Sequence, residues 1–206
     1  MNTEMWLTFT LASTILLIIP GPTILTVISY SISHGYRTKL PLIIAVALGD
    51  STALALSLLG LGALLAESAF WFQVVKWVGG LYLLFLGIRL LRAGIKPSEI
   101  HQETEHASRR KLFINTYLVT ALNPKGIVFF VAFLPLFIDA NSNVTHQLWI
   151  LALTFVALAT FNATLYAVFA GKARQLLSSA KTQRVFNFTG GSLLSVAGFW
   201  ALSAKH

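Results

Sequence analysis

Long apolar runs separated by short basic segments are the feature that most constrains this chain. A helix needs about 17–25 apolar residues to cross the hydrocarbon core of a bilayer. Six runs are long enough, covering residues 5–28, 40–65, 70–91, 112–138, 148–170 and 185–202. Only 11% of the residues are charged, against about 25% in a typical soluble domain. The sequence therefore predicts an all-α integral membrane protein with six transmembrane helices.

The lysines and arginines predict how these helices are oriented. Of the 15 basic residues, 12 lie in the segments 29–39, 89–111 and 171–184. Cytoplasmic loops carry the excess of Lys and Arg, so these connections should face the cytoplasm and both termini the periplasm. The net charge of +8 is thus spread over loops and forms no face for nucleic acid. No Lys or Arg precedes the first run, so we expect that run to be retained rather than cleaved.

Pro20-Gly21-Pro22 interrupts the first apolar run. A proline inside a helix removes a backbone donor and clashes with the preceding turn, which costs about 3 kcal/mol or more. At membrane depth, an interrupted backbone is tolerated only where protein buries it or where it lines a watery cavity. We therefore expect the first transmembrane helix to be broken near the bilayer midplane.

A corresponding interruption lies in the fourth run, where Asn123-Pro124 is followed by Lys125. Asn favours the N-cap of a helix and Pro favours its first turn, so one half-helix should end here and another begin. The two breaks suggest that the chain is duplicated.

Glycines support a duplication at an offset of 111 residues. This offset relates Gly79, Gly80 and Gly87 of the third run to Gly190, Gly191 and Gly198 of the sixth. Two halves of three helices each must be inverted relative to one another, as in many transporters. We predict one transmembrane domain over residues 1–206, with repeat one at 1–91, a cytoplasmic loop at 92–111 and repeat two at 112–206. Helices 1 and 4 would be the interrupted ones, and the glycines close-packing positions.

The two breaks together predict a binding site. Each restarted half-helix directs unpaired N–H groups and a positive dipole end toward the midplane, and each preceding half-helix leaves carbonyl groups there. Donors for a carboxylate and acceptors for an ammonium suit a zwitterion such as a free amino acid. The alternative is a pair of structural kinks whose backbone groups are satisfied by neighbouring helices.

Three polar side chains inside the spans join this candidate site. Asp50 is the only acid well inside a span, and it would bind a substrate ammonium or accept a proton; the alternative is a buried Asp held by Ser51 and Thr52. Lys125 would neutralise Asp50 or attract a substrate carboxylate, unless it extends to the membrane surface. Asn162 lies 112 residues after Asp50, as its symmetry partner or as an interhelical hydrogen-bond donor.

No cofactor or metal is expected. The chain has no cysteine, and no histidine lies in a predicted span, which argues against an intramembrane enzyme with a nucleophile or a metal cluster. The acids and histidines of residues 99–106 lie in a solvated loop, where a metal site is disfavoured.

The motifs of the chain resemble those of the LysE/RhtB family of amino-acid exporters. They are Pro20-Gly21-Pro22, the loop His34-Gly35-Tyr36-Arg37, the stretch Lys76-Trp77-Val78-Gly79-Gly80, and Asn123-Pro124-Lys125 followed by Phe129-Phe130 and Phe133-Leu134-Pro135. The resemblance implies a bacterial inner-membrane protein that exports amino acids, with coupling to the proton gradient. One departure is Leu136, where many members have glutamine.

These observations predict a secondary transporter that exports small neutral amino acids, such as homoserine, threonine or leucine, by alternating access. One deep acid favours neutral over dibasic substrates. The expected partners are the substrate and membrane lipid, with self-association left open. A channel or an exporter of other small solutes or cations is the alternative.

Overall fold

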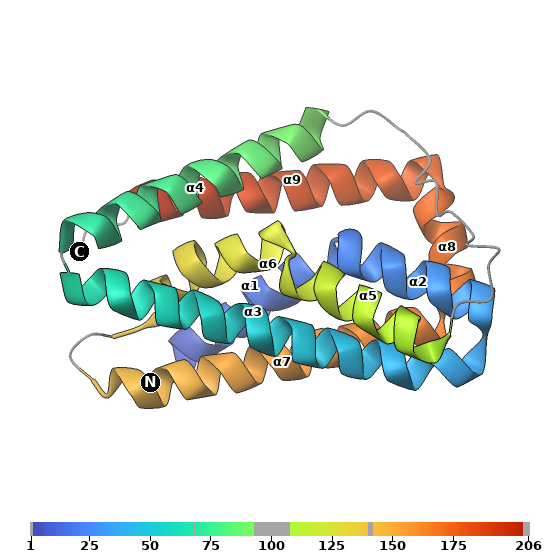
Figure 1. Ribbon diagram of the computed structural model, residues 1–206. Coiled ribbons are helices and arrows are strands. Elements are labelled where there is room, and N and C mark those ends of the chain that lie inside the picture. Colours follow the sequence, from blue (N-terminus) through green and yellow to red (C-terminus); the bar gives the residue numbers. More distant parts are fainter. Residues whose placement is uncertain (1, 68, 93–107, 140–141, 204–206) are drawn as a thin grey trace.

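A computed structural model describes residues 2–67, 69–92, 108–139 and 142–203, and within these ranges the chain is helical without any strand. The all-α class is thus confirmed. The elements are α1 (Thr3–Ile18), α2 (Pro22–His34), η1 (Tyr36–Thr38), α3 (Lys39–Glu67), α4 (Ala69–Arg92), α5 (Arg109–Ala121), α6 (Pro124–Val128), a π-helical turn η2 (Phe129–Phe133), a 3₁₀ turn η3 (Leu134–Phe137), α7 (Val144–Val168), α8 (Ala170–Ser178) and α9 (Ala180–Ser203) (Figure 1).

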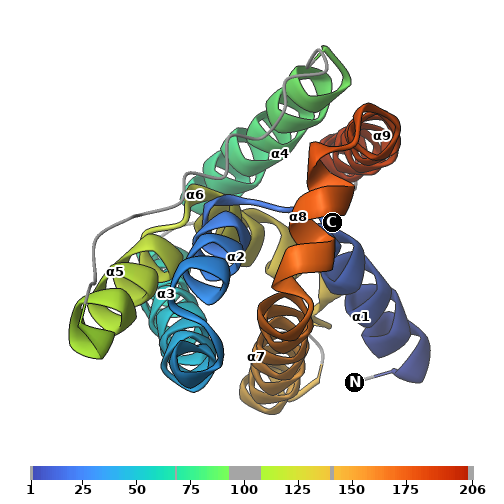
Figure 2. The ribbon, with the colours of Figure 1, turned by 90° about the vertical axis from the view of Figure 1, so that its right-hand side faces the viewer.

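The helices form a bundle with the short broken segments in its middle. Helices α4 and α9 lie side by side, on the opposite side of the bundle from α3 and α7 (Figures 1 and 2). Between these two layers lie α2 and α6. The centre of the molecule is therefore built from the segments that follow the two helix breaks.

In the described part of the chain, two helices have the length and apolar character of a membrane span, and a bent pair of helices makes a third if it is one broken span. They are residues Lys39–Gly60 of α3, the whole of α7, and the pair α1 and α2, whose axes are bent by 53° at the Pro-Gly-Pro break. These segments support a multi-pass membrane protein. The arrangement of six spans in two repeats stays a prediction.

Glycine contacts hold α4 against α9. A methyl group built on Gly198 would lie 2.7 Å from the carbonyl oxygen of Gly80, and one on Gly191 would lie 2.8 Å from that of Gly87. Small residues allow membrane helices to approach this closely. The interpretation of Gly80, Gly87, Gly191 and Gly198 as close-packing positions is confirmed.

Two segments differ from the sequence-based expectation. The fourth run is not two half-helices alone, because α6 continues into the π-helical and 3₁₀ turns, where Pro135 lacks the N–H that an α-helix would need. Residues 171–184, expected to be a connecting loop, contain most of α8. This short helix buries Ala173 and Leu177 against Ile24 and Ile28 of α2.

The glycine interface predicts the effect of one added methyl group. A Cβ at Gly198 would lie 2.6 Å from the backbone nitrogen of Leu84, which cannot move aside as a side chain would. We expect Gly198→Ala to destabilise the fold by about 1–3 kcal/mol, measured as a lower unfolding temperature in detergent.

The matched control is Gly60→Ala in α3, where a methyl group would meet no atom within 4 Å. This change should leave the unfolding temperature equal or higher, since Ala favours helix over Gly by about 1 kcal/mol. Equal unfolding temperatures for the two variants would contradict the glycine-mediated contact.

Candidate functional site

The two helix breaks meet at one small polar cavity. The cavity has a volume of about 40 Å³. Five of the residues predicted from the sequence for the binding site line it. They are Gly21, Asp50, Asn123, Lys125 and Asn162. The remaining three, Pro20, Pro22 and Pro124, are not among the lining residues and act through the backbone. Residues far apart in sequence are thus brought together as the candidate site requires.

Prolines, and not the glycine, set the first break. A residue before proline is disfavoured in the helical conformation, and both Ile19, before Pro20, and Gly21, before Pro22, have extended backbones. Pro22 then begins α2, where its missing N–H costs nothing. Gly21 has a φ of −117°, which any residue adopts. A methyl group there would lie 3.7 Å from Cδ of Lys125, an ordinary contact.

Asn123 caps the second break and ties it to the first. Its Oδ1 accepts a hydrogen bond from the backbone N–H of Lys125 at 3.2 Å, and Pro124 occupies the first turn of α6. This is the N-cap predicted from the Asn-Pro pair. Its Nδ2 donates to the hydroxyl of Thr23 in α2 at 3.2 Å. The side chain of Asn123 therefore links the beginnings of the two restarted half-helices.

The carbonyl end of α1 is satisfied entirely by side chains. The ammonium of Lys125 donates to the carbonyls of Leu16 and Ile19, at 2.6 Å each. The last carbonyls of a helix have no partner within that helix, and in a bilayer no water replaces them. The Lys125 ammonium therefore does not extend to the membrane surface. It binds two carbonyl groups of the chain, so it is not available solely for a substrate carboxylate.

Two residues of α7 satisfy the remaining carbonyls of this turn. Asn162 donates to Leu17 at 3.0 Å, and the hydroxyl of Tyr166 donates to Ile18 at 2.9 Å. The interpretation of Asn162 as an interhelical hydrogen-bond donor is confirmed. Tyr166 was not predicted as a site residue. Its spacing of four residues from Asn162, which places both on one face of a helix, was the available signal.

Asp50 lies in α3 with 8% of its surface exposed and borders the cavity. Its neighbours do not hold it, because Ser51 and Thr52 donate to backbone carbonyls one turn earlier in α3. In the described ranges of the chain, the Asp50 carboxylate makes no direct hydrogen bond or ion pair, and the charge that acts on it is the Lys125 ammonium, which borders the same cavity. A buried carboxylate without a direct hydrogen-bond donor is costly in a membrane protein, so a cationic ligand would be favoured beside it.

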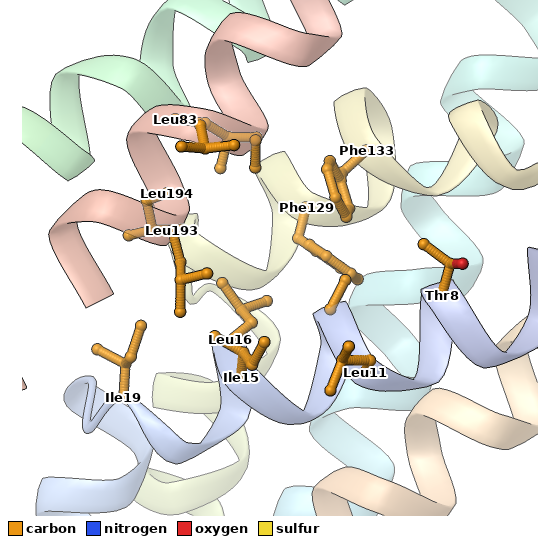
Figure 3. Close-up of a pocket in the computed structure, with 13 residues that line it drawn as sticks. Thr8, Leu11, Ile15, Leu16, Ile19, Leu83, Phe129, Phe133, Leu193 and Leu194 are labelled. Carbon is orange, nitrogen blue, oxygen red and sulfur yellow. The ribbon is translucent and has the colours of Figure 1, made fainter. Parts of the chain in front are cut away.

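A second cavity, of about 240 Å³, is almost entirely apolar. It lies between α1, α4, η2 and α9, with Leu16 of α1 and Ile19, the residue that follows α1, on its wall (Figure 3). The carbonyls of these same two residues bind Lys125 on the polar side. The last turn of α1 therefore forms a thin partition between a polar and an apolar cavity.

In the portions of the chain that the structure describes, no three His, Asp or Glu side chains are grouped so that they could hold a metal ion. The acidic and histidine-containing segment 99–106 lies outside the described residues.

Apolar helices whose backbone breaks surround a buried charged cavity are typical of membrane transport proteins. The family model of the LysE type translocators matches residues 14–204. The chain therefore belongs to the LysE type translocator family.

Curated relatives cover the whole chain. The homoserine/homoserine lactone efflux protein of Salmonella typhimurium is 32% identical over 206 residues, and that of Salmonella typhi is 32% identical over the same length, with all of each chain covered. A membrane protein of Vibrio cholerae without a described function is 30% identical over 205 residues, again with both chains fully covered. No solved structure matches the chain.

The hydrogen bonds on the α1 carbonyls predict a graded loss of stability. Asn162→Leu keeps the side-chain volume but leaves the carbonyl of Leu17 without its donor, at a cost of about 0.6–2 kcal/mol. Tyr166→Phe should cost less, because it removes only a hydroxyl and keeps the ring that packs against α2 and α8. Unfolding temperatures in detergent measure both. The interpretation of Asn162 as a cap of α1 is wrong if Asn162→Leu unfolds at the temperature of the unmodified protein.

Proposed function

We propose that this protein exports small neutral amino acids, homoserine foremost, from the cytoplasm by alternating access at the cavity between the two helix breaks. The observation that carries this proposal is the Asp50 carboxylate, which is buried without a direct hydrogen bond in the cavity where both breaks meet. Family membership supports a translocator, and the name of the Salmonella relative supports the substrate class.

Substrate binding follows from the groups that remain unsatisfied. The ammonium of the amino acid would bind Asp50, since the carbonyls of α1 already have donors. Its carboxylate would face the N-terminus of α2, a helix of 13 residues, where Thr23 and Ile24 border the cavity. Unpaired N–H groups and the helix dipole favour an anion there. A second acid, which a dibasic substrate would need, is lacking among the described lining residues.

Movement is required for export. A cavity of about 40 Å³ holds roughly three water molecules by its accessible volume, which is too little for an amino acid. The glycine-packed pair α4 and α9 has few contacts with α1, and the apolar cavity of about 240 Å³ lies between them. A rigid movement of α4 and α9 relative to α1 is the rearrangement that this packing favours.

The proposed inverted repeats gain support from the same glycines. The offset of 111 residues relates Gly80 to Gly191 and Gly87 to Gly198. In the contact between Gly80 and Gly198, the offset replaces Gly80 by Gly191 and Gly198 by Gly87. The contact between Gly191 and Gly87 is the second close contact of this interface. An interface that maps onto itself is what a twofold relation between two halves requires.

Coupling to protons is the second part of the proposal. Asp50 would bind a proton after releasing the substrate ammonium on the periplasmic side, because one carboxylate cannot hold both cations at once. The proposed site is the bacterial inner membrane, with six spans and both termini in the periplasm.

Removing the charge of Asp50 tests the site. Asp50→Asn should insert normally and reduce efflux of labelled homoserine from proteoliposomes by roughly 10–100-fold, as expected for the loss of a charged hydrogen-bond partner. Glu4→Gln, which neutralises an exposed acid at the start of α1, should export at the rate of the unmodified protein.

Normal efflux by Asp50→Asn would contradict the assignment of Asp50 as the ammonium ligand. In the same vesicles, saturable exchange of labelled for unlabelled homoserine identifies a carrier. A current that rises in proportion to voltage without saturation would identify a channel instead.

Reporter fusions test the topology. A reporter that is active only in the periplasm should give a signal after Ser142 and none after Gly35, because the segment 29–39 carries basic residues. The reverse pattern would invert the proposed orientation and make the pathway an inward one.

A further inference from the structure

The Lys125 side chain reaches from one helix break to the other. Its backbone lies in the first turn of α6, after the second break, while its ammonium donates to the carbonyls of Leu16 and Ile19 at the first break. Its stem passes Gly21, where a Cβ would lie 3.7 Å from Cδ and 3.9 Å from Nζ. A primary ammonium belonging to the chain therefore occupies the carbonyl end of α1.

The α-ammonium of an amino acid is the same chemical group. Carbonyl oxygens at a helix C-terminus and a neighbouring carboxylate are the ligands that a primary ammonium prefers. Both kinds of ligand border the same polar cavity, as the end of α1 and as Asp50. Lys125 and a substrate ammonium would therefore draw on the same set of negative groups.

Charge compensation of Asp50 must change during a transport cycle. Asp50 is the sole carboxylate that borders the cavity in the described ranges of the chain, and an uncompensated charge near the bilayer centre is strongly unfavourable. While substrate is bound, its ammonium compensates Asp50. After release, another cation must do so before the carrier can return. Lys125 borders the same cavity and carries the opposite charge.

We propose that Lys125 is an internal counter-cation, whose ammonium compensates Asp50 after the substrate has left and so allows the carrier to return unloaded. This inference rests on the proposed export function, and it is the alternative to protonation of Asp50 on the return path. The flexible stem and three rotatable donors of a lysine let its ammonium turn from the α1 carbonyls toward Asp50, which borders the same cavity. Net export then needs no substrate molecule on the return path. In exchange, the carrier returns with a substrate molecule whose ammonium compensates Asp50, so exchange does not require Lys125 for this step.

Two transport modes measured on the same vesicles test the proposal. Proteoliposomes loaded with labelled homoserine are diluted into medium without homoserine, for net efflux, and into medium with unlabelled homoserine, for exchange. In Lys125→Gln, the ratio of net efflux to exchange should fall by about tenfold or more, because only the unloaded return is blocked. Lys172→Gln, an exposed position of α8, should keep the ratio of the unmodified protein.

Chemical restoration of the charge separates this effect from misfolding. The chain contains no cysteine, so Lys125→Cys introduces a single thiol. Alkylation of that thiol with 2-bromoethylamine forms a thioether that carries a primary ammonium, with loss of bromide and the thiol proton. After alkylation of the same protein sample, net efflux should rise. The ratio of net efflux to exchange should then approach that of the unmodified protein.

The outcomes distinguish this inference from the proposed function. An unchanged ratio in Lys125→Gln, equal loss of both modes, or no recovery on aminoethylation would overturn the counter-cation role, and the first of these would favour a proton as the compensating charge. Absence of saturable homoserine flux in the unmodified protein, in either mode, would overturn the proposed function instead.

Discussion

The need to satisfy the last carbonyls of α1 organises the centre of this protein. Two prolines end α1 inside an apolar run, and a bilayer supplies no water for the carbonyl groups that are left. Lys125, Asn162 and Tyr166 supply donors instead. Because these three residues come from α6 and α7, the break in the first half of the chain is stabilised by the second half. The positions of the helices around the polar cavity follow from this arrangement.

The prolines allowed the breaks to be predicted from the sequence. Their effect is local, because a missing N–H and a fixed φ act on the same turn in any fold. The cap at Asn123 was predictable for the same reason. The burial of Asp50 was predictable from its place inside an apolar run. The partners of Lys125 were not predictable, since they depend on which helix lies opposite α6.

Helix α8 and the turn η2 were not predicted, because their sequences also fit a different local structure. Lys172 and Arg174 made residues 171–184 look like a loop, although Ala170, Ala173 and Leu177 repeat at helical spacing and are buried in α8. The π-helical turn of η2 lies in an aromatic segment whose composition also suits an α-helix. Its geometry is explained by packing: Phe129 and Phe130 contact Phe155 of α7, with ring centroids 5.5 Å and 4.7 Å apart.

The glycine contact between α4 and α9 also bears on how the chain is made. Its two sides are separated by about half of the sequence, so α4 has no partner for its glycine face when it leaves the ribosome. At a synthesis rate of about 5–20 residues per second, roughly 5–20 s pass before the matching glycines of α9 are made. During that interval the face made by Gly80 and Gly87 must be covered by lipid or by a membrane insertion factor. Helix α9, which is synthesised later, therefore completes the packing of α4.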